Sequence, residues 1–190
     1  MSINDETANG PADFKKMDSW KRLPPKRLES VKIRCFIFQC RDIPAADADG
    51  QSDSEIRIWN PDGKEHKTRV IEDSLNPIYF ETLEMLYDMA DLDNSPPIVL
   101  DIWDRDQGVL GNESFDFLGR ATIFLNEAST NPLGDSRGKS KADIEVCNKV
   151  PNPKWHKIRM GFDDSLPSCG EVLCSFVIVQ DDFDFKTPVK

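Results

Sequence analysis

The chain has 190 residues, of which 38% are hydrophobic, and its formal net charge is −10 at neutral pH. This length suits one large domain or one domain with extensions, and the hydrophobic content is enough for a buried core, which excludes a chain that is disordered throughout. The acidic charge argues against general nucleic-acid binding, which uses a basic face.

The cysteines and histidines give no sign of a metal or redox site. The five cysteines form no Cys-X-X-Cys pair, and their odd number indicates reduced thiols in a reducing compartment. His66 and His156 are far apart and do not have zinc-ligand spacing. There is no signal peptide, and no apolar run approaches the roughly 18 residues of a membrane-spanning helix. We therefore expect a cytoplasmic protein.

The two ends of the chain are polar. Residues 1–28 become partly basic after Asp13, and we expect a flexible extension. The basic stretch around Trp20 is either a solvated linker or an arm that touches a membrane surface. Residues 181–190 form an acidic and polar tail.

Alternation of apolar and polar residues predicts eight short strands separated by turns. The expected strands lie at residues 31–38, 56–59, 66–71, 78–87, 98–103, 117–125, 155–160 and 171–180. An irregular insertion, residues 126–152, precedes the seventh strand. Because no long helix is indicated, the pattern predicts an all-β fold, an eight-stranded antiparallel β-sandwich that spans residues 29–180.

Two connections between the predicted strands carry clustered carboxylates. The aspartates in question are Asp47, Asp49 and Asp53 after the first strand, and Asp104, Asp106 and Asp116 after the fifth. We predict the second cluster to lie on one long acidic loop. The loops of a sandwich collect at its two ends, so these two segments can face each other. Calcium takes six to eight oxygen ligands from such loops; the alternative is a pair of solvated loops without metal.

Several ordered motifs resemble those of C2 domains. RDIPAADADGQSD (41–53) resembles the first calcium loop of that family, and LDIWDRD (100–106) with FDFLGRA (115–121) resembles the third. KTRVIEDSLNPIYFE (67–81) resembles the fourth-strand region of that family, with its Leu-Asn-Pro turn. The likeness extends over about residues 28–180. It is greatest to an internal C2 domain of the ferlins, membrane-trafficking proteins with several such domains. GEVLCSFVIV comes last in the chain, which implies the permuted, second topology of the C2 fold.

The resemblance implies Ca²⁺ as the bound ion. Its implied ligands are the side chains of Asp47, Asp53, Asp104, Asp106 and Asp116, and the backbone carbonyls of Ala46 and Arg105. Two departures from the family pattern stand out. The third loop is about four residues longer, which leaves either Asp116 or Glu113 to complete the site. Ser54-Glu55 stands where the family usually has Pro-Tyr.

The function implied is calcium-dependent binding to anionic phospholipid membrane by a peripheral module that is not an enzyme. Val109 and Leu110, at the tip of the third loop, would enter the membrane, or would instead pack back on the sandwich. Lys67 and Arg69 would share one strand face as a basic patch, or would be an ordinary solvated face. The alternative function is a calcium-independent scaffold domain for protein interactions.

The ferlin resemblance also implies a setting for the module. The parent protein would act in vesicle fusion or membrane trafficking and would carry a membrane anchor. Other C2 domains and proteins of the fusion machinery are the further partners that we expect. Nothing in the sequence suggests nucleic acid as a partner.

Overall fold

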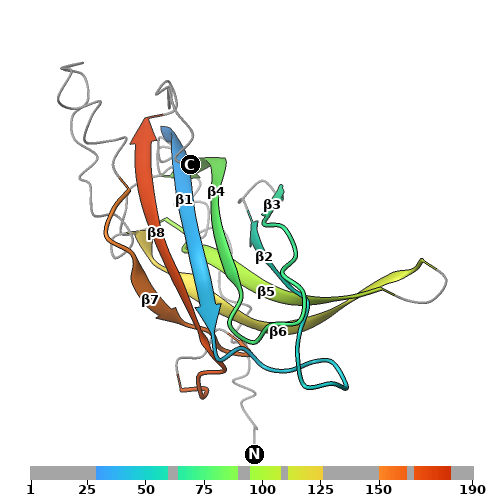
Figure 1. The fold of residues 1–190 in the computed structure, drawn as a ribbon. Helices are drawn as coiled ribbons and strands as arrows, with labels where there is room; N and C mark the ends of the chain where they lie inside the picture. The colour runs from blue at the N-terminus through green and yellow to red at the C-terminus, as the bar shows by residue number, and fades with distance from the viewer. Residues whose placement is uncertain are drawn as a thin grey trace, which may run out of the picture.

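The structure, a computed structural model, describes residues 29–59, 64–89, 95–107, 111–125, 150–161 and 165–180. The predicted extension 1–28, the tail 181–190 and residues 126–149 of the predicted insertion lie outside these ranges. Within these ranges, eight strands form two four-stranded antiparallel sheets that pack face to face (Figure 1). This confirms the predicted eight-stranded β-sandwich. Within the described part of the chain, no helix has the length and apolar character needed to cross a bilayer.

One sheet contains the first and last strands as central neighbours. Its order is β4-β1-β8-β7, in which β4 is Ile78–Met89, β1 is Glu29–Arg41, β8 is Glu171–Gln180 and β7 is Lys154–Lys157. The pairing of β1 with β8 runs from Val31 opposite Gln180 to Arg41 opposite Glu171. This arrangement is the predicted permuted topology.

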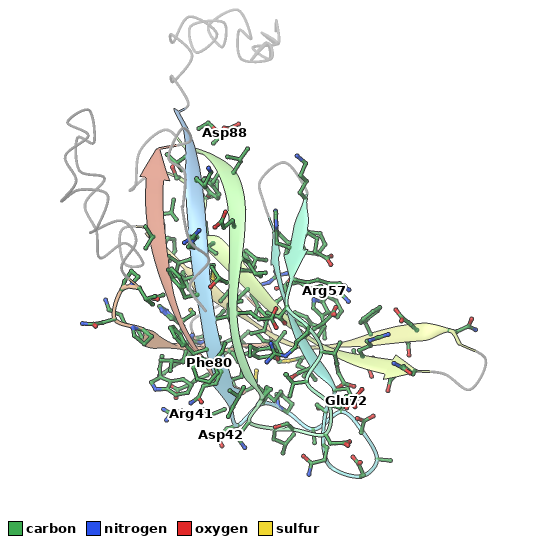
Figure 2. The ribbon with its side chains drawn as sticks, turned by 45° about the horizontal axis from the view of Figure 1, so that its top comes forward. Arg41, Asp42, Arg57, Glu72, Phe80 and Asp88 are labelled. Atoms are coloured by element: carbon green, nitrogen blue, oxygen red, sulfur yellow. The ribbon has the colours of Figure 1, made fainter. Side chains whose placement is uncertain are left out.

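The other sheet carries most of the acidic residues of interest. Its order is β3-β2-β5-β6, in which β3 is Glu65–Lys67, β2 is Ser54–Trp59, β5 is Ile98–Gln107 and β6 is Glu113–Ile123. The first acidic segment connects β1 to β2, so it passes from one sheet to the other. Figure 2 shows Arg41, Asp42 and Glu72 at this end of the sandwich and Asp88 at the opposite end.

Alternate residues of the strands point into the space between the sheets, because successive side chains of a strand face opposite ways. Ile33 and Ile37 of β1 meet Ile56 of β2 and Leu100 of β5 in one buried cluster. Removing these side chains from water is the main force that holds the two sheets together. Cys35 lies in the same core, and burial raises the pKa of its thiol well above the ordinary value.

The prediction of a long acidic loop that carries Asp104, Asp106 and Asp116 is wrong. β5 continues to Gln107 and β6 begins at Glu113, so these residues form a β-hairpin that projects away from the body of the sandwich (Figure 1). The hairpin is held by cross-strand side-chain pairs, since Arg105 forms an ion pair with Glu113 and Ser114 donates a hydrogen bond to Asp106.

The third strand is shorter than predicted, because it ends at Lys67 instead of continuing to Ile71. The buried Thr68 hydroxyl accepts a hydrogen bond from the backbone N–H of Ile56 at 3.0 Å and donates to the carbonyl of Arg69 at 2.9 Å. The Thr68 hydroxyl thus accepts the hydrogen bond that a backbone carbonyl of a paired strand would accept from Ile56. Ile71 returns to the sheet only as an isolated bridge to Ser54.

Candidate metal centre

The first acidic segment is a compact loop shaped by its own hydrogen bonds. Gly50 has a φ of 84°, a backbone conformation that favours glycine, and its N–H donates to the carbonyl of Asp47 at 3.0 Å. The Asp49 carboxylate accepts a hydrogen bond from the N–H of Gln51 at 3.0 Å. One of the loop carboxylates is therefore occupied in holding the turn, which leaves Asp47 to face the neighbouring sheet.

The second acidic segment is a regular strand. Asp104 and Asp106 are alternate residues of β5, so both side chains lie on the same face of the sheet. This face continues the core face of Leu100 and Ile102 to the end of the sandwich. Because the strand is already paired with β2 and β6 at Asp104, the position of this carboxylate is fixed by both neighbours.

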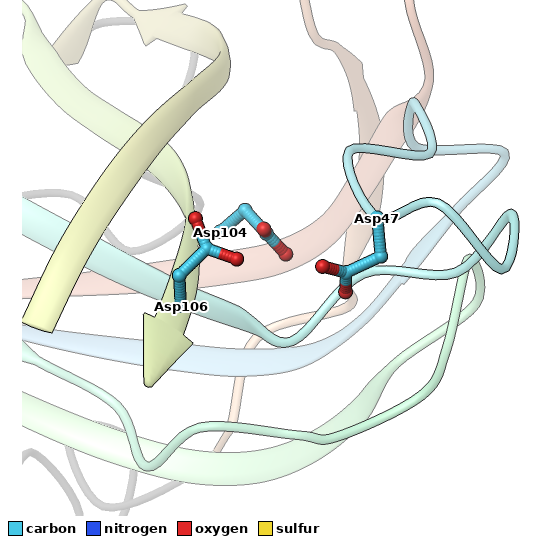
Figure 3. A group of neighbouring side chains, drawn as sticks. All are labelled: Asp47, Asp104 and Asp106. Carbon is cyan, nitrogen blue, oxygen red and sulfur yellow. The ribbon is translucent and has the colours of Figure 1, made fainter. Parts of the chain in front are cut away.

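Three carboxylates from the two segments converge. Asp47, Asp104 and Asp106 each offer an oxygen, and these three oxygens lie within 4.8 Å of one another (Figure 3). Figure 3 shows Asp47 reaching from the loop toward the pair on the strand. Like charges at this spacing repel, so the arrangement favours a bound cation or a shared proton.

Asp104 is the most confined member of this group, with 1% of its surface exposed. Its Oδ1 accepts a 2.6 Å hydrogen bond from the N–H of Asp53, whereas its buried Oδ2 has no hydrogen-bond partner among the described residues. Burial raises the pKa of Asp104, the Asp53 N–H opposes that shift, and the charges of Asp47 and Asp106 add to it. A buried carboxylate oxygen without a donor is costly unless something outside the chain satisfies it.

Asp47 is half-buried and has similar electrostatics. Loss of hydration raises the pKa of Asp47, and the charges of Asp53 and Asp106 raise it further. Both shifted groups thus sit in a field of other carboxylates. Perturbed carboxyl pairs of this kind are a common mark of functional sites.

The structure places Asp53 beside the three carboxylates, close enough for its charge to raise the pKa of Asp47, but it is not one of the three that converge. Its Oδ1 accepts a 2.8 Å hydrogen bond from the N–H of Asp73. Its backbone connects the two segments, because its N–H donates to Asp104 and its carbonyl accepts from the N–H of Arg105 at 2.9 Å. Ala46 and Arg105, whose carbonyls were predicted as ligands, are chain neighbours of group members.

Asp116 and Glu113 fall on opposite faces of the hairpin. Asp116 lies directly opposite Asp104 in the strand register, so it shares the face of the carboxylates, but it is exposed and is not one of the three that converge. Glu113 lies opposite Gln107 and pairs with Arg105, on the other face. Of these two residues, the register therefore brings Asp116 nearer to the site.

Of the four residues predicted to contact the membrane, the structure describes Lys67 and Arg69. Lys67 lies 3.4 Å from the carboxylate of Glu55, and Arg69 lies 2.9 Å from that of Glu81. Arg69 is also beyond the end of β3, so the two cations do not share a strand face as predicted. Val109 and Leu110 lie outside the described residues.

The sequence did not indicate the groups that lie behind the carboxylates and hold their backbone in place. The N–H of Asp73, which binds Asp53, and the hydroxyls of Ser54 and Tyr79, which contact each other at 2.8 Å, have no motif of their own. The one available signal was the departure at Ser54, where a hydroxyl replaces the usual proline.

Comparison with known proteins agrees with this geometry. The sequence model of the C2 domain matches residues 31–141. Myoferlin of Homo sapiens is 27% identical over 161 residues, which cover 80% of this chain but 7% of that protein. Synaptotagmin-like protein 2 of Mus musculus is 30% identical over 167 residues, covering 76% of this chain and 16% of that protein. The chain thus spans a small fraction of these relatives.

Solved structures share the fold. A single C2 domain of a plant Extended Synaptotagmin 1 superimposes with a TM-score of 0.52 at 16% identity, covering 81% of this chain and 97% of that one. The calcium-bound pair of C2 domains of Extended-Synaptotagmin 2 gives a TM-score of 0.51 at 18% identity, covering 81% of this chain and 47% of that one.

Proposed function

The chain belongs to the C2 domain family and is similar to the ferlins, and we propose that it is a calcium-dependent module for binding anionic phospholipid membrane. The observation that carries the calcium dependence is the buried Oδ2 of Asp104, which has no hydrogen-bond donor and lies among the carboxylates of Asp47 and Asp106. A cation supplies what this oxygen lacks.

The donor set fits calcium. Calcium binds carboxylate and carbonyl oxygens at 2.3–2.6 Å, so two ligands on opposite sides of one ion lie about 5 Å apart. The three oxygens of Asp47, Asp104 and Asp106 already lie within 4.8 Å of one another. These residues would hold the ion, with Asp53, Asp116 and the carbonyls of Ala46 and Arg105 as additional oxygens. All are hard oxygen donors, the type that calcium prefers to sulfur or imidazole.

The bound ion would supply charge reversal. Without a cation, the acidic end repels an anionic membrane, as does the whole chain with its net charge of −10. A divalent cation inverts the local field, and its unfilled coordination positions accept phosphate oxygens of lipid headgroups. The chain would thus bind membrane reversibly at the end of the sandwich that carries Asp47.

We assign no catalytic role to this module. In a longer ferlin-like protein, several modules of this kind would add their affinities for one membrane, which suits a role in membrane trafficking or vesicle fusion at the cytoplasmic face. The other C2 domains of such a protein and the fusion machinery are the protein partners that we propose.

Calcium titration with a matched control tests the proposal. We expect saturable heat in calorimetry and a rise in Tm with calcium for the wild type, because an ion that binds only the folded state stabilises it. The variant Asp104→Asn/Asp106→Asn should lose both signals. Asp88→Asn removes an exposed charge at the opposite end and should keep them. Vesicles containing phosphatidylserine should sediment the wild type in millimolar calcium and not in chelator.

One observation favours a second candidate, the calcium-independent scaffold domain. The Asp49 and Asp53 carboxylates are already bonded to backbone N–H groups, so part of the acidic end is ordered without metal. No heat and no change in Tm at millimolar calcium, with or without anionic vesicles, would contradict the calcium-dependent module and favour the scaffold.

A further inference from the structure

A pair of buried hydroxyls connects the two sheets directly behind the carboxylates. The Ser54 hydroxyl and the Tyr79 hydroxyl lie 2.8 Å apart, and the Tyr79 hydroxyl also lies 3.3 Å from the carbonyl of Ser54. Both residues are 0% exposed. Ser54 begins β2 in one sheet and Tyr79 lies in β4 of the other, so this polar contact bridges the two sheets.

The Ser54 side of this contact leads to Asp104. Ser54 lies opposite Asp104 in the β2–β5 register and follows Asp53, whose N–H binds the Asp104 carboxylate. The backbone of Ser54 is itself held on its other edge by two 2.9 Å hydrogen bonds with Ile71. A shift of Ser54 would therefore move the N–H that positions Asp104.

The Tyr79 side leads to Asp47. The segment just before Tyr79 is bonded to the base of the Asp47 loop, since Cys40 donates to the carbonyl of Pro77 at 2.9 Å and Ile43 donates to the carbonyl of Leu75 at 3.1 Å. The first part of the loop that carries Asp47 is thus bonded to the segment before Tyr79, and its last part leads into β2 at Ser54, the sheet of Asp104 and Asp106.

We propose that the Tyr79–Ser54 hydroxyl pair is a positioning element that sets the separation between Asp47 and the pair Asp104 and Asp106, and thereby the affinity for calcium. This inference rests on the proposed function and deepens it. Asp47 comes from the connection between the two sheets and Asp104 and Asp106 come from β5, and a single ion needs their oxygens within about 5 Å. The hydroxyl pair is a side-chain contact that spans both sheets next to them. Neither residue would touch the ion.

Tyr79→Phe isolates this role, because it removes one oxygen and keeps the aromatic ring in the core. We expect the Kd for calcium to rise on the order of tenfold, the lower end of what loss of an outer-shell partner costs a metal site. Ser54→Ala removes the other hydroxyl and should weaken calcium binding in the same direction. It also serves as the second variant if Tyr79→Phe does not fold.

Tyr87→Phe is the matched control. Tyr87 is a second buried tyrosine of β4, its hydroxyl donates to the carbonyl of Pro96, and it lies eight residues from Tyr79, about 26 Å along the strand. Both tyrosine variants should lower the Tm in chelator, because Tyr87→Phe loses the hydrogen bond to Pro96 and Tyr79→Phe loses the contacts with the hydroxyl and the carbonyl of Ser54. Only Tyr79→Phe and Ser54→Ala should raise the Kd for calcium.

Calorimetric calcium titrations of the wild type and the three variants decide the matter. Equal Kd values for wild type, Tyr79→Phe and Ser54→Ala would overturn the positioning role and leave the proposed function standing. A rise in Kd of the same size in Tyr87→Phe would also overturn it, since the effect would then be general destabilisation. A wild type that binds no calcium would overturn the proposed function and this inference together.

Discussion

Asp101 and Asp104 lie three residues apart on β5, and both are almost fully buried, with 2% and 1% of their surfaces exposed. They point to opposite faces of the sheet, because their spacing is odd. Asp101 faces Arg120, which forms an ion pair with it and donates a 2.7 Å hydrogen bond, and it also accepts a 3.0 Å hydrogen bond from the indole of Trp59. Asp104 faces two other carboxylates.

The contrast shows that burial alone does not identify a ligand-binding carboxylate. The outer face of this sheet pairs its buried acids with cations of the same sheet. Glu55 repeats the pattern, because it pairs with Arg57 of its own strand at 2.6 Å and with Lys67 of β3. The acidic end pairs Asp104 with one backbone N–H and leaves its second oxygen unsatisfied. The first environment is complete among the described residues. The second lacks a donor for one oxygen, and we propose that a cation from solution completes it.

The largest effect is expected from Asp104→Asn. The substitution removes a charge that the ion needs, so calcium affinity should fall by at least about a hundredfold. It keeps the Oδ1 that accepts the Asp53 N–H and relieves repulsion from Asp47 and Asp106, so the Tm in chelator should rise by a few degrees. Calorimetry and thermal melts in chelator measure the two effects. A lower Tm would show that the carboxylate stabilises the metal-free fold and would remove the contrast with Asp101.

The next largest effect is expected from Asp101→Asn, which should lower stability and leave calcium affinity unchanged. Loss of the charge that faces the partly buried Arg120 should reduce the free energy of unfolding by about 2 kcal/mol. Urea unfolding in chelator gives this value. Calcium affinity should stay at the wild-type level, because the side chain lies on the other face. A loss of calcium affinity without unfolding would mean that the two faces are coupled.

A smaller effect distinguishes the two acids of the hairpin. Asp116→Asn should weaken calcium binding by about tenfold or less, because the register places Asp116 on the face of the carboxylates. Glu113→Gln should leave it unchanged, since Glu113 pairs with Arg105 on the opposite face. Calcium titration of both variants at the same ionic strength makes the comparison, and the opposite ranking would show that the hairpin changes its twist when the ion binds.

The smallest effect is a pH dependence of the metal-free protein. The pKa values of Asp47 and Asp104 are raised on folding. The folded state therefore holds their protons more tightly than the unfolded chain does, and the stability that these protons give is present below the ordinary aspartate pKa of about 3.9 and is lost as pH rises through the raised values. The Tm advantage of Asp104→Asn over the wild type should thus shrink as pH falls from about 7 toward about 4. Thermal melts in chelator at several pH values measure this, and a Tm difference between the variant and the wild type that does not change with pH would contradict the prediction.

Local pattern predicted the strands well where one face is buried. β8 has the predicted bounds Glu171–Gln180. The clustering of loops at the ends of a sandwich, together with the resemblance to C2 domains, predicted that Asp47 would lie near Asp104 and Asp106, more than fifty positions away. The hairpin 104–116 escaped prediction because both faces of its outer part are polar or half-exposed, so the alternation that indicates a strand is missing there. Cross-strand partners determined the rest.

Lys67 and Arg69 illustrate that limit. As sequence, they are two cations on one predicted strand, and a basic patch follows naturally. Their charges are compensated by Glu55 and Glu81, which lie twelve residues away in each case and meet them only through the strand register and the following turn. The Ser54–Tyr79 contact depends in the same way on how the two sheets pack, which a single sequence does not reveal.

The neighbouring positions of β1 and β8 have a mechanical consequence. The start of β1 and the end of β8 lie side by side, with Val31 opposite Gln180, at the end of the sandwich away from Asp47. Tension between whatever precedes β1 and whatever follows β8 would act across this strand pair, parallel to its hydrogen bonds, because antiparallel hydrogen bonds run perpendicular to the strands. The hydrogen bonds between β1 and β8 would then break one after another, starting from this end. A stretched neighbouring segment would begin to separate the sandwich at this end while the carboxylates remained assembled at the other.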